Sequence, residues 1–466
     1  MKKINITWAA MGICLLTSCT ENVKDAKRVN ALPDIYPDYA GVTIPANIAP
    51  LNFAPQSDEA LMIDAVVKAP NGQTLHGQGK ESTYFDQKAW KEMLQAAVGD
   101  SLIVTTSIKD SKGWHTYNDF ALYVSADAID YGMTYRLIEP GYEVWSKMGI
   151  YERNLSNFEE RALIENTQFQ GCVNCHSTSR KNPDDMTLHV RGEHGATLLQ
   201  IDGEIQAYNT ATQLTAGLCV YPYWHPEGRY LAYSTNTTRQ VFHTLDEKRI
   251  EVFDAASDLQ IYDTKSNELL VCPQLKQDSV METFPVFSAD GRTLYFCAAK
   301  KLTGENPDLL TIRYNLCSIG FDPETGTFGT KIDTLVYAEK EGKSISFPRP
   351  SHDGRFLCFT LSDYGQFSIW HKEADLYLLD LQADSLTMLS TESKAIRNMK
   401  EVNSDKTESF HNWSMNSRWL LFSSRRDDGL FTRPYFCHVS EDGQISKPFM
   451  LPQESPKAYY RDLFMS

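Results

Sequence analysis

The sequence lacks a second long apolar stretch, which limits how the chain can meet a membrane. Beyond the first residues, no run approaches the roughly 20 apolar residues that a membrane-spanning helix needs. The run from Ile4 to Leu16 is itself too short to span a bilayer, and Lys2 and Lys3 precede it. A short apolar core after basic residues is typical of a secretory signal. We therefore expect an exported chain whose mature part does not cross the membrane.

Positive charge is also scarce. The chain has 45 Lys and Arg against 60 Asp and Glu, a formal net charge of −15. An acidic surface argues against nucleic acid and against anionic lipid headgroups as partners. The sequence shows no Ser/His/Asp set, no pair of acids spaced for catalysis and no metal-ligand cluster apart from the motif described below.

The cysteines lack the spacing of a disulfide framework, although an exported protein could form one. Cys14 lies in the expected signal. Six others sit inside apolar, strand-like runs: Cys219, Cys272, Cys297, Cys317, Cys358 and Cys437. We expect these six to be small buried core residues rather than bridges.

The apolar run closes on Leu16-Thr17-Ser18-Cys19, which resembles the bacterial lipobox. That resemblance implies a lipoprotein signal peptide over residues 1–18 and lipid attachment at Cys19. Residues 19–30 are polar and would form a tether. The implied location is the cell envelope, lipid-anchored, with the outer membrane as the expected site and the chain on its periplasmic or surface side.

One short motif carries chemistry. Cys172-Val173-Asn174-Cys175-His176 is a C-x-x-C-H sequence, the attachment signature of c-type haem. Its two thiols can reach both vinyl groups of one porphyrin, and His176 is placed as the proximal iron ligand. A zinc site would need a second pair of ligands, and a redox thiol pair a βαβ setting; neither is nearby. A Cys172–Cys175 disulfide stays open but leaves His176 without a role, so we expect one covalent haem c.

The second axial ligand is left open by the sequence. Met186 and His189 lie ten and thirteen residues beyond His176, and a loop of that length extends roughly 33 Å or more, enough to pass a porphyrin edge. A Met ligand would raise the reduction potential, whereas a second His would lower it. His189 as an ordinary strand histidine and Met186 as a pocket wall are equally admissible. Arg191 is either a partner of a haem propionate or a surface residue.

The first part of the mature chain is rich in β-branched and aromatic residues. Alternating runs separated by Gly-containing turns predict strands over 60–67, 101–108 and 120–124, and a short helix is expected over 86–97. We interpret residues 31–150 as a small β-sandwich. Ser156 to Glu159 has the form of a capping box, which predicts a helix up to Asn166 that leads into a haem attachment segment, residues 151–195.

The rest of the chain is repetitive. Four segments combine aromatic residues, a tight turn and an apolar strand: 223–233, 286–296, 349–359 and 412–422. Their turn positions Gly228, Gly291, Gly354 and Ser417 are each 63 residues apart. Each unit then adds two more strands, as a propeller blade requires. The region 196–217 adds half a blade, so we expect five or six blades over 196–466.

The Asp-Gly-Arg turns with flanking aromatics resemble TolB-like β-propeller repeats. This implies a mainly β fold: a sandwich-like N-terminal domain, a short helical haem segment and a C-terminal propeller. Trp224, Phe287 and Trp413 then serve mainly to lock blades together.

The whole arrangement resembles cytochrome c-like lipoproteins of the Bacteroides type, and that likeness implies haem binding and electron transfer. The leading hypothesis is a monohaem c-type cytochrome lipoprotein that exchanges electrons with envelope redox proteins, with the propeller as a docking platform. The alternatives are a haem-dependent envelope oxidoreductase and a glycan- or protein-binding propeller with a haem sensor.

Overall fold

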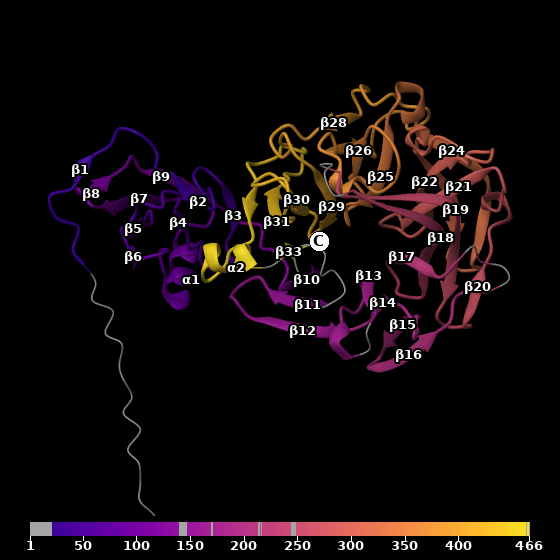
Figure 1. Cartoon of the computed structure of the whole chain (residues 1–466), viewed down its shortest axis with the longest axis horizontal. Coiled ribbons are helices and arrows are strands. Elements are labelled where there is room, and N and C mark those ends of the chain that lie inside the picture. The colour runs from indigo at the N-terminus through magenta and orange to yellow at the C-terminus, as the bar shows by residue number, and fades with distance from the viewer. Residues whose placement is uncertain are drawn as a thin grey trace, which may run out of the picture.

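A computed structural model describes residues 21–138, 147–168, 171–212, 215, 217–243, 248–462 and 464–465. An N-terminal body and a ring of sheets lie side by side (Figure 1). The expected signal peptide, residues 1–18, and the expected lipid site Cys19 lie outside the described residues. Within these ranges no helix is long and apolar enough to cross a membrane.

The N-terminal body is built on one mixed sheet of seven strands, in the order β1-β8-β7-β5-β6, with β9 joining β7 to β3. Its strands are β1 (Lys27–Arg28), β3 (Thr43–Pro45), β5 (Met62–Lys68), β6 (Thr74–Gly79), β7 (Ser101–Asp110), β8 (Gly113–Thr116) and β9 (Phe120–Ser125), and a separate pair joins β2 (Ile35–Tyr36) to β4 (Ala54–Pro55). The three expected strands are thus confirmed as β5, β7 and β9. The expected sandwich is wrong, because no second large sheet faces this one within the described part of the body.

Helix α1 (Gln87–Ala96) packs in the core of this body, where a sandwich would need a second sheet. Asp86 caps it by accepting a hydrogen bond from the Ala89 N–H at 2.9 Å. Its buried side chains are Trp90, Met93 and Leu94, as the helical spacing of Trp90 and Leu94 predicts. The sequence therefore located the helix correctly but not its role in covering the sheet.

Six four-stranded antiparallel sheets form a propeller (Figure 1). Blade 1 contains β10 (Gly132–Ile138), β11 (Met148–Asn154), β12 (Glu160–Glu165) and β33 (Phe464–Met465); blade 2, β13 (Cys172–Thr178), β14 (Met186–Arg191), β15 (Ala196–Ile201) and β16 (Glu204–Tyr208); blade 3, β17 (Cys219–Trp224), β18 (Tyr230–Phe242), β19 (Ile250–Asp263) and β20 (Glu268–Leu270); blade 4, β21 (Val280–Phe287), β22 (Thr293–Lys300), β23 (Asn315–Asp322) and β24 (Thr327–Val336); blade 5, β25 (Ser344–Pro350), β26 (Phe356–Ser362), β27 (Asp375–Asp380) and β28 (Ile396–Asn398); blade 6, β29 (Glu408–Trp413), β30 (Trp419–Ser424), β31 (Arg433–His438) and β32 (Phe449–Met450). The remaining helical pieces are η2 (Asn166–Gln168), η3 (Pro273–Leu275), η4 (Leu309–Thr311), η5 (Ala338–Glu341), η6 (Ser368–Trp370) and α2 (Pro456–Asp462). Of the two expected blade counts, six is the observed one.

The ring closes through the last strand of the chain. Strand β33 pairs antiparallel with β10, joining Ile138 to Phe464 and Leu137 to Met465. The half blade expected over 196–217 finds its partners in β13 and β14, which carry the haem motif and the candidate distal ligands. The propeller sheets therefore begin at Gly132.

The helix expected from Ser156 to Asn166 is wrong. Strand β12 occupies Glu160–Glu165 and pairs with β11. The polar residues that resemble a capping box form a turn instead: Asn154 accepts the Ser156 N–H at 2.8 Å, and Asn157 accepts the Glu159 N–H at 2.8 Å. Because the blade needs an outer strand here, pairing overrides the local helical signal, and residues 151–195 form strands rather than a helical haem segment.

The repeated turns require a left-handed residue. Gly291 has φ 69° and Gly354 φ 72°, and Ser417 adopts φ 61° at the corresponding place. A Cβ on Gly291 would lie 2.0 Å from the His225 imidazole of the preceding blade. The Ser417 hydroxyl accepts a hydrogen bond from the Asp353 N–H of the preceding blade at 3.0 Å, an interaction that a glycine could not form.

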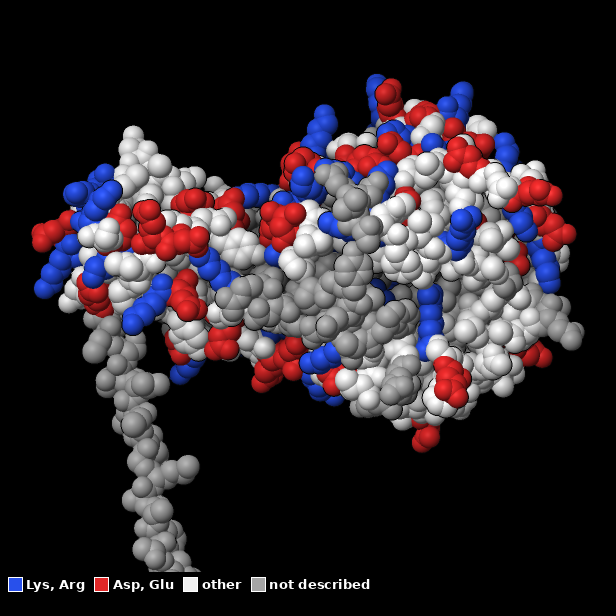
Figure 2. Space-filling model, in the orientation of Figure 1, with Lys and Arg blue, Asp and Glu red and all other residues white. Residues whose placement is uncertain are grey.

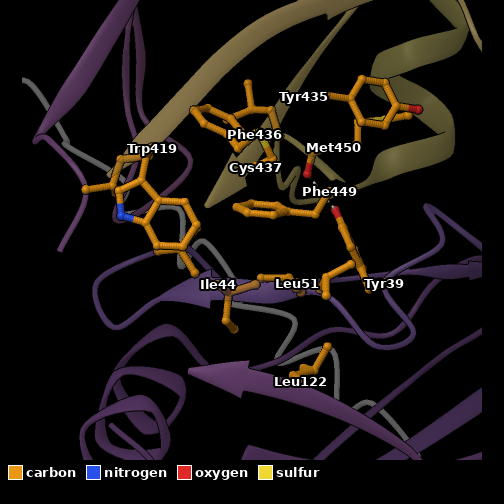
Figure 3. Close-up of a cluster of buried hydrophobic side chains, with 14 of the residues drawn as sticks. Tyr39, Ile44, Leu51, Leu122, Trp419, Tyr435, Phe436, Cys437, Phe449 and Met450 are labelled. Atoms are coloured by element: carbon orange, nitrogen blue, oxygen red, sulfur yellow. Dashed lines mark hydrogen bonds between the residues drawn. The ribbon is translucent and has the colours of Figure 1, made fainter. Parts of the chain in front are cut away.

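One apolar core joins the N-terminal body to blade 6 (Figure 3). Ile44 and Leu122 from the body lie in the same buried cluster as Trp419 and Phe449 from the blade. The Trp419 indole N–H also donates to the Asp127 carbonyl at 3.1 Å.

The six cysteines expected in the core are all buried and unbridged, which confirms that prediction.

Candidate functional site

The C-x-x-C-H motif lies on β13, the innermost strand of blade 2. Strands β13, β17, β21, β25 and β29 each contact the next around the axis of the ring. In the ladder with β14, Cys172 faces Arg191 and Asn174 faces His189. The register then jumps to Ser177, so Cys175 and His176 form a β-bulge.

This bulge recurs in four other blades. The register makes the same jump after Val220, Thr283, Ser346 and Ser409. The first bulged residue has a positive φ each time: Cys175 (50°), Tyr221 (50°), Phe284 (54°), Phe347 (52°) and Phe410 (46°). Positive φ is uncommon for residues other than glycine, and the repeated value marks it as a property of the blade.

The aromatic members of this set form an arc around the axis. Ring centres are 4.5 Å apart between Tyr221 and Phe284, 4.4 Å between Phe284 and Phe347, and 4.4 Å between Phe347 and Phe410. Cys175 takes the fifth position, so the arc is interrupted at blade 2.

The second bulged residue is a histidine in two blades and a proline in three. His411 places Nε2 3.0 Å from the Cys358 carbonyl of the preceding blade, and burial lowers its pKa to about 3. His176 is similar: burial lowers its pKa to about 4, although a hydrogen bond with the Thr134 backbone of blade 1 acts in the opposite direction and raises the pKa. The imidazole of His176 is therefore neutral at neutral pH, the form that binds a metal.

Both thiols interact electrostatically with the Arg136 guanidinium of blade 1. Cys172 belongs to an apolar cluster with Val173, Leu188 and Val190. Burial raises the pKa of Cys175, while the nearby Arg191 guanidinium and a hydrogen bond from the backbone of Tyr221 oppose that rise. Both thiols are unbridged, so the alternative of a Cys172–Cys175 disulfide is not formed in this structure.

A cavity of about 920 Å³ opens beside the motif. One part is a slot between blades 1 and 2, and the other is the mouth of the propeller at the end that carries the repeated turns. The slot is lined by Met133, Thr134, Leu163, Ile164, His176, Met186, Leu188 and Leu198, and the mouth by Arg180, Tyr223, Trp224, Arg349, His352 and Trp413.

The structure separates the two candidate distal ligands. Met186 and Leu188 line the slot together with His176. His189 belongs to the opposite face of β14, the face from which Thr187 contacts the Tyr233 hydroxyl of blade 3 at 2.8 Å. His189 is buried there, and desolvation lowers its pKa to about 4. Met186 is thus brought together with His176, and His189 is not.

The residues fit a haem c only in part. His176 and Met186 open onto one cavity whose volume lies in the range of cofactor sites. Neither Cys172 nor Cys175 lines that cavity, so the two thiols and the imidazole do not face one space in this conformation of β13. Within the described ranges, no three His, Cys, Asp or Glu side chains are grouped to hold a metal ion.

The charged residues at the mouth were missed by sequence reasoning. Arg349 stands at a repeat position where blades 2, 3, 4 and 6 have Ser177, Tyr223, Val286 and Asn412. The sequence signal for this site was an arginine at a repeat position that is uncharged in those blades. Its relevance to binding is visible only in the ring, where the inner strands meet around the axis.

No family model matches the chain, and no curated protein matches it. Among solved structures, the chain is similar to TolB from Acinetobacter baumannii, at 11% identity over 77% of this chain and 81% of that one, with a TM-score of 0.42. It is also similar to the β-propeller domain of the Trilobed protease from Pyrococcus furiosus, at 10% identity over 75% and 81%, with a TM-score of 0.35. An oligogalacturonate lyase from Vibrio parahaemolyticus matches at 12% identity over 64% and 85%, with a TM-score of 0.33. These overlaps are low, and the propeller assignment rests on the six sheets described above.

Proposed function

We propose that the chain is a monohaem c-type cytochrome of the cell envelope, with haem bound through Cys172 and Cys175 and with His176 as proximal ligand. A haem held in this place would supply one-electron transfer. The observation that carries the proposal is the C-x-x-C-H motif at a bulge whose histidine opens onto a cavity also lined by Met186.

The protein side of the site suits this role. Burial keeps His176 neutral and therefore able to ligate. Leu163, Ile164 and Leu188 give the slot apolar walls that would limit water. The geometry favours Met186 over His189 as the second ligand, and a thioether ligand raises the reduction potential.

Covalent attachment requires the thiols to turn toward the slot, because neither cysteine lines it. Cys175 and His176 stand outside the β13–β14 ladder, because the register jumps from Asn174 to Ser177. Reorienting these two residues therefore breaks no ladder pair, whereas Cys172 is paired with Arg191 in that ladder. The cost falls on the packing of Cys172, which must leave its apolar cluster.

The cellular part of the proposal rests on the N-terminal sequence. Lipidation at Cys19 would hold the chain in the envelope, and the propeller would present its surface to envelope redox proteins. Acidic and basic side chains are interspersed over the face shown in Figure 2, so docking there would depend on local complementarity rather than on one charged face.

Expression with haem-attachment machinery tests the proposal. Denatured wild-type protein should retain haem stain, and Cys175→Ala should lose most of it. Cys437→Ala, which alters a buried cysteine of blade 6, is the matched control and should stain normally. Equal staining of wild type and Cys175→Ala, or none in either, would overturn covalent attachment here.

Carbon monoxide separates the carrier from the alternatives. A reduced haem held by both His176 and Met186 ignores the gas, as expected of an electron carrier. Ready binding would instead favour a haem-dependent oxidoreductase or a sensor.

A further inference from the structure

The mouth of the propeller holds two arginines with no carboxylate to balance them. Arg349 on β25 donates from Nη1 to the Pro348 carbonyl at 2.9 Å and lies 5.5 Å from the Tyr223 ring centre. Arg180, just after β13, reaches only backbone carbonyls, those of Ala289 at 3.5 Å and His352 at 3.4 Å. Within the described part of the chain, neither guanidinium forms an ion pair.

The carboxylates that line the same cavity do not neutralise this pair. Glu152 is paired with Arg161, and Asp130 accepts the Met415 N–H at 2.9 Å. The third, Asp184, is exposed to solvent. The arginines are therefore a local positive centre in a chain of net charge −15.

The aromatic residues beside them are held in place. The Trp224 indole donates to the Ser177 carbonyl at 3.1 Å, and the Trp413 indole donates to the Arg349 carbonyl at 3.0 Å. Their N–H groups are thus satisfied within the protein; both side chains are buried, and the edge of each that lines the cavity is apolar. Burial also lowers the pKa of Arg349, which shows that this charge is held partly out of water.

We propose that the propeller mouth binds a carboxylate-bearing molecule with a flat apolar body, the carboxylate at Arg180 and Arg349 and the body beside Tyr223 and the two tryptophans. A guanidinium fork matches a carboxylate in two parallel hydrogen bonds. A charge already desolvated by the protein gains most from such a partner. The carboxylate has two possible sources, a separate ligand or the propionates of a haem in the adjoining slot. Only the second rests on the function proposed above.

Calorimetric titration with 2-naphthoate tests the site, with the uncharged 2-naphthalenemethanol as the matched probe. The carboxylate should bind at least about tenfold more tightly than the alcohol, as a charge-assisted hydrogen bond predicts. This comparison needs no protein variant, so it is independent of any folding defect. Arg349→Gln should weaken the binding of 2-naphthoate by about tenfold or more. Arg292→Gln removes an exposed arginine that does not itself line the cavity, and it should leave the affinity for 2-naphthoate unchanged.

The source of the carboxylate follows from running the titration twice, on the protein as purified and on the Cys172→Ala/Cys175→Ala chain, which cannot attach haem. Binding to both forms identifies a separate ligand site; binding to the double variant alone identifies the propionates as the usual occupant. Equal affinity for acid and alcohol in both forms, or equal effects of Arg349→Gln and Arg292→Gln, would overturn the site. Neither result depends on whether haem staining succeeds.

Discussion

Replacing Glu251 by glutamine should loosen a hairpin that crosses the propeller at the end opposite the repeated turns. Strands β18 and β19 run beyond blade 3, over the start of β21, and reach blade 5. There the Tyr364 hydroxyl donates to the Glu251 carboxylate, and the His243 and His371 Nε2 atoms lie 3.3 and 3.7 Å from it. Glu251→Gln keeps the volume and removes the charge.

The magnitude follows from the carboxyl's pKa. The His371 imidazole, the Tyr364 hydroxyl and the His243 imidazole around the carboxylate lower this pKa from 4.5 to about 2. That shift corresponds to about 3 kcal/mol of stabilisation of the hairpin. Partial solvent screening reduces the loss expected in the variant to about 2 kcal/mol, which is roughly a 30-fold increase in the equilibrium constant for local opening of the hairpin. Because the folded pKa is lowered, the stabilisation is complete above pH 4.5 and disappears as the pH falls toward 2.

Hydrogen exchange on the hairpin amides measures this directly. At pH 7 the variant should exchange roughly 30-fold faster over the outer halves of β18 and β19. The difference from wild type should shrink when opening is measured below pH 4.5. Glu305→Gln, at an exposed glutamate without such partners, is the control. Equal hairpin protection in Glu251→Gln and wild type at pH 7 would refute the reasoning.

Other substitutions test the blades and the slot. Phe347→Ala removes a buried ring from the aromatic arc and should lower the free energy of unfolding by about 3–5 kcal/mol in denaturant titration; a loss below 1 kcal/mol would mean that the arc does not carry packing. Gly354→Ala should cost about 1–2 kcal/mol through its positive φ alone, and Gly291→Ala clearly more because its Cβ meets the neighbouring blade; equal losses would contradict the turn geometry. In haem-loaded protein, Met186→Ala should lower the reduction potential while His189→Ala leaves it unchanged, as measured by redox titration; the reverse result would make the histidine the ligand.

The propeller was predictable from the sequence because each blade begins with a turn whose residues are determined locally. The repeated turn needs a left-handed residue, and Gly228, Gly291 and Gly354 supply it at regular spacing. The same locality explains why α1 was found, since Asp86 and the spacing of its apolar face act within one helix.

The predictions that failed concern segments whose structure depends on partners distant in the sequence. Glu160–Glu165 is a strand because β11 pairs with it, which no local pattern shows. The closing strand has only two residues, Phe464 and Met465, too few for a periodicity. The C-x-x-C-H motif is visible in the sequence, but its place at an inner-strand bulge became visible only when Cys175 aligned with four aromatics around the axis. The mouth arginines, Arg180 and Arg349, come from different blades and meet only in the ring.

The most direct test of the central claim is the mass of the proteolytic peptide that contains residues 172–176, taken from native protein made with haem-attachment machinery. Covalent haem on Cys172 and Cys175 predicts a peptide heavier by one haem, with both thiols protected from alkylation. A peptide of unmodified mass with two free, alkylatable thiols would contradict it.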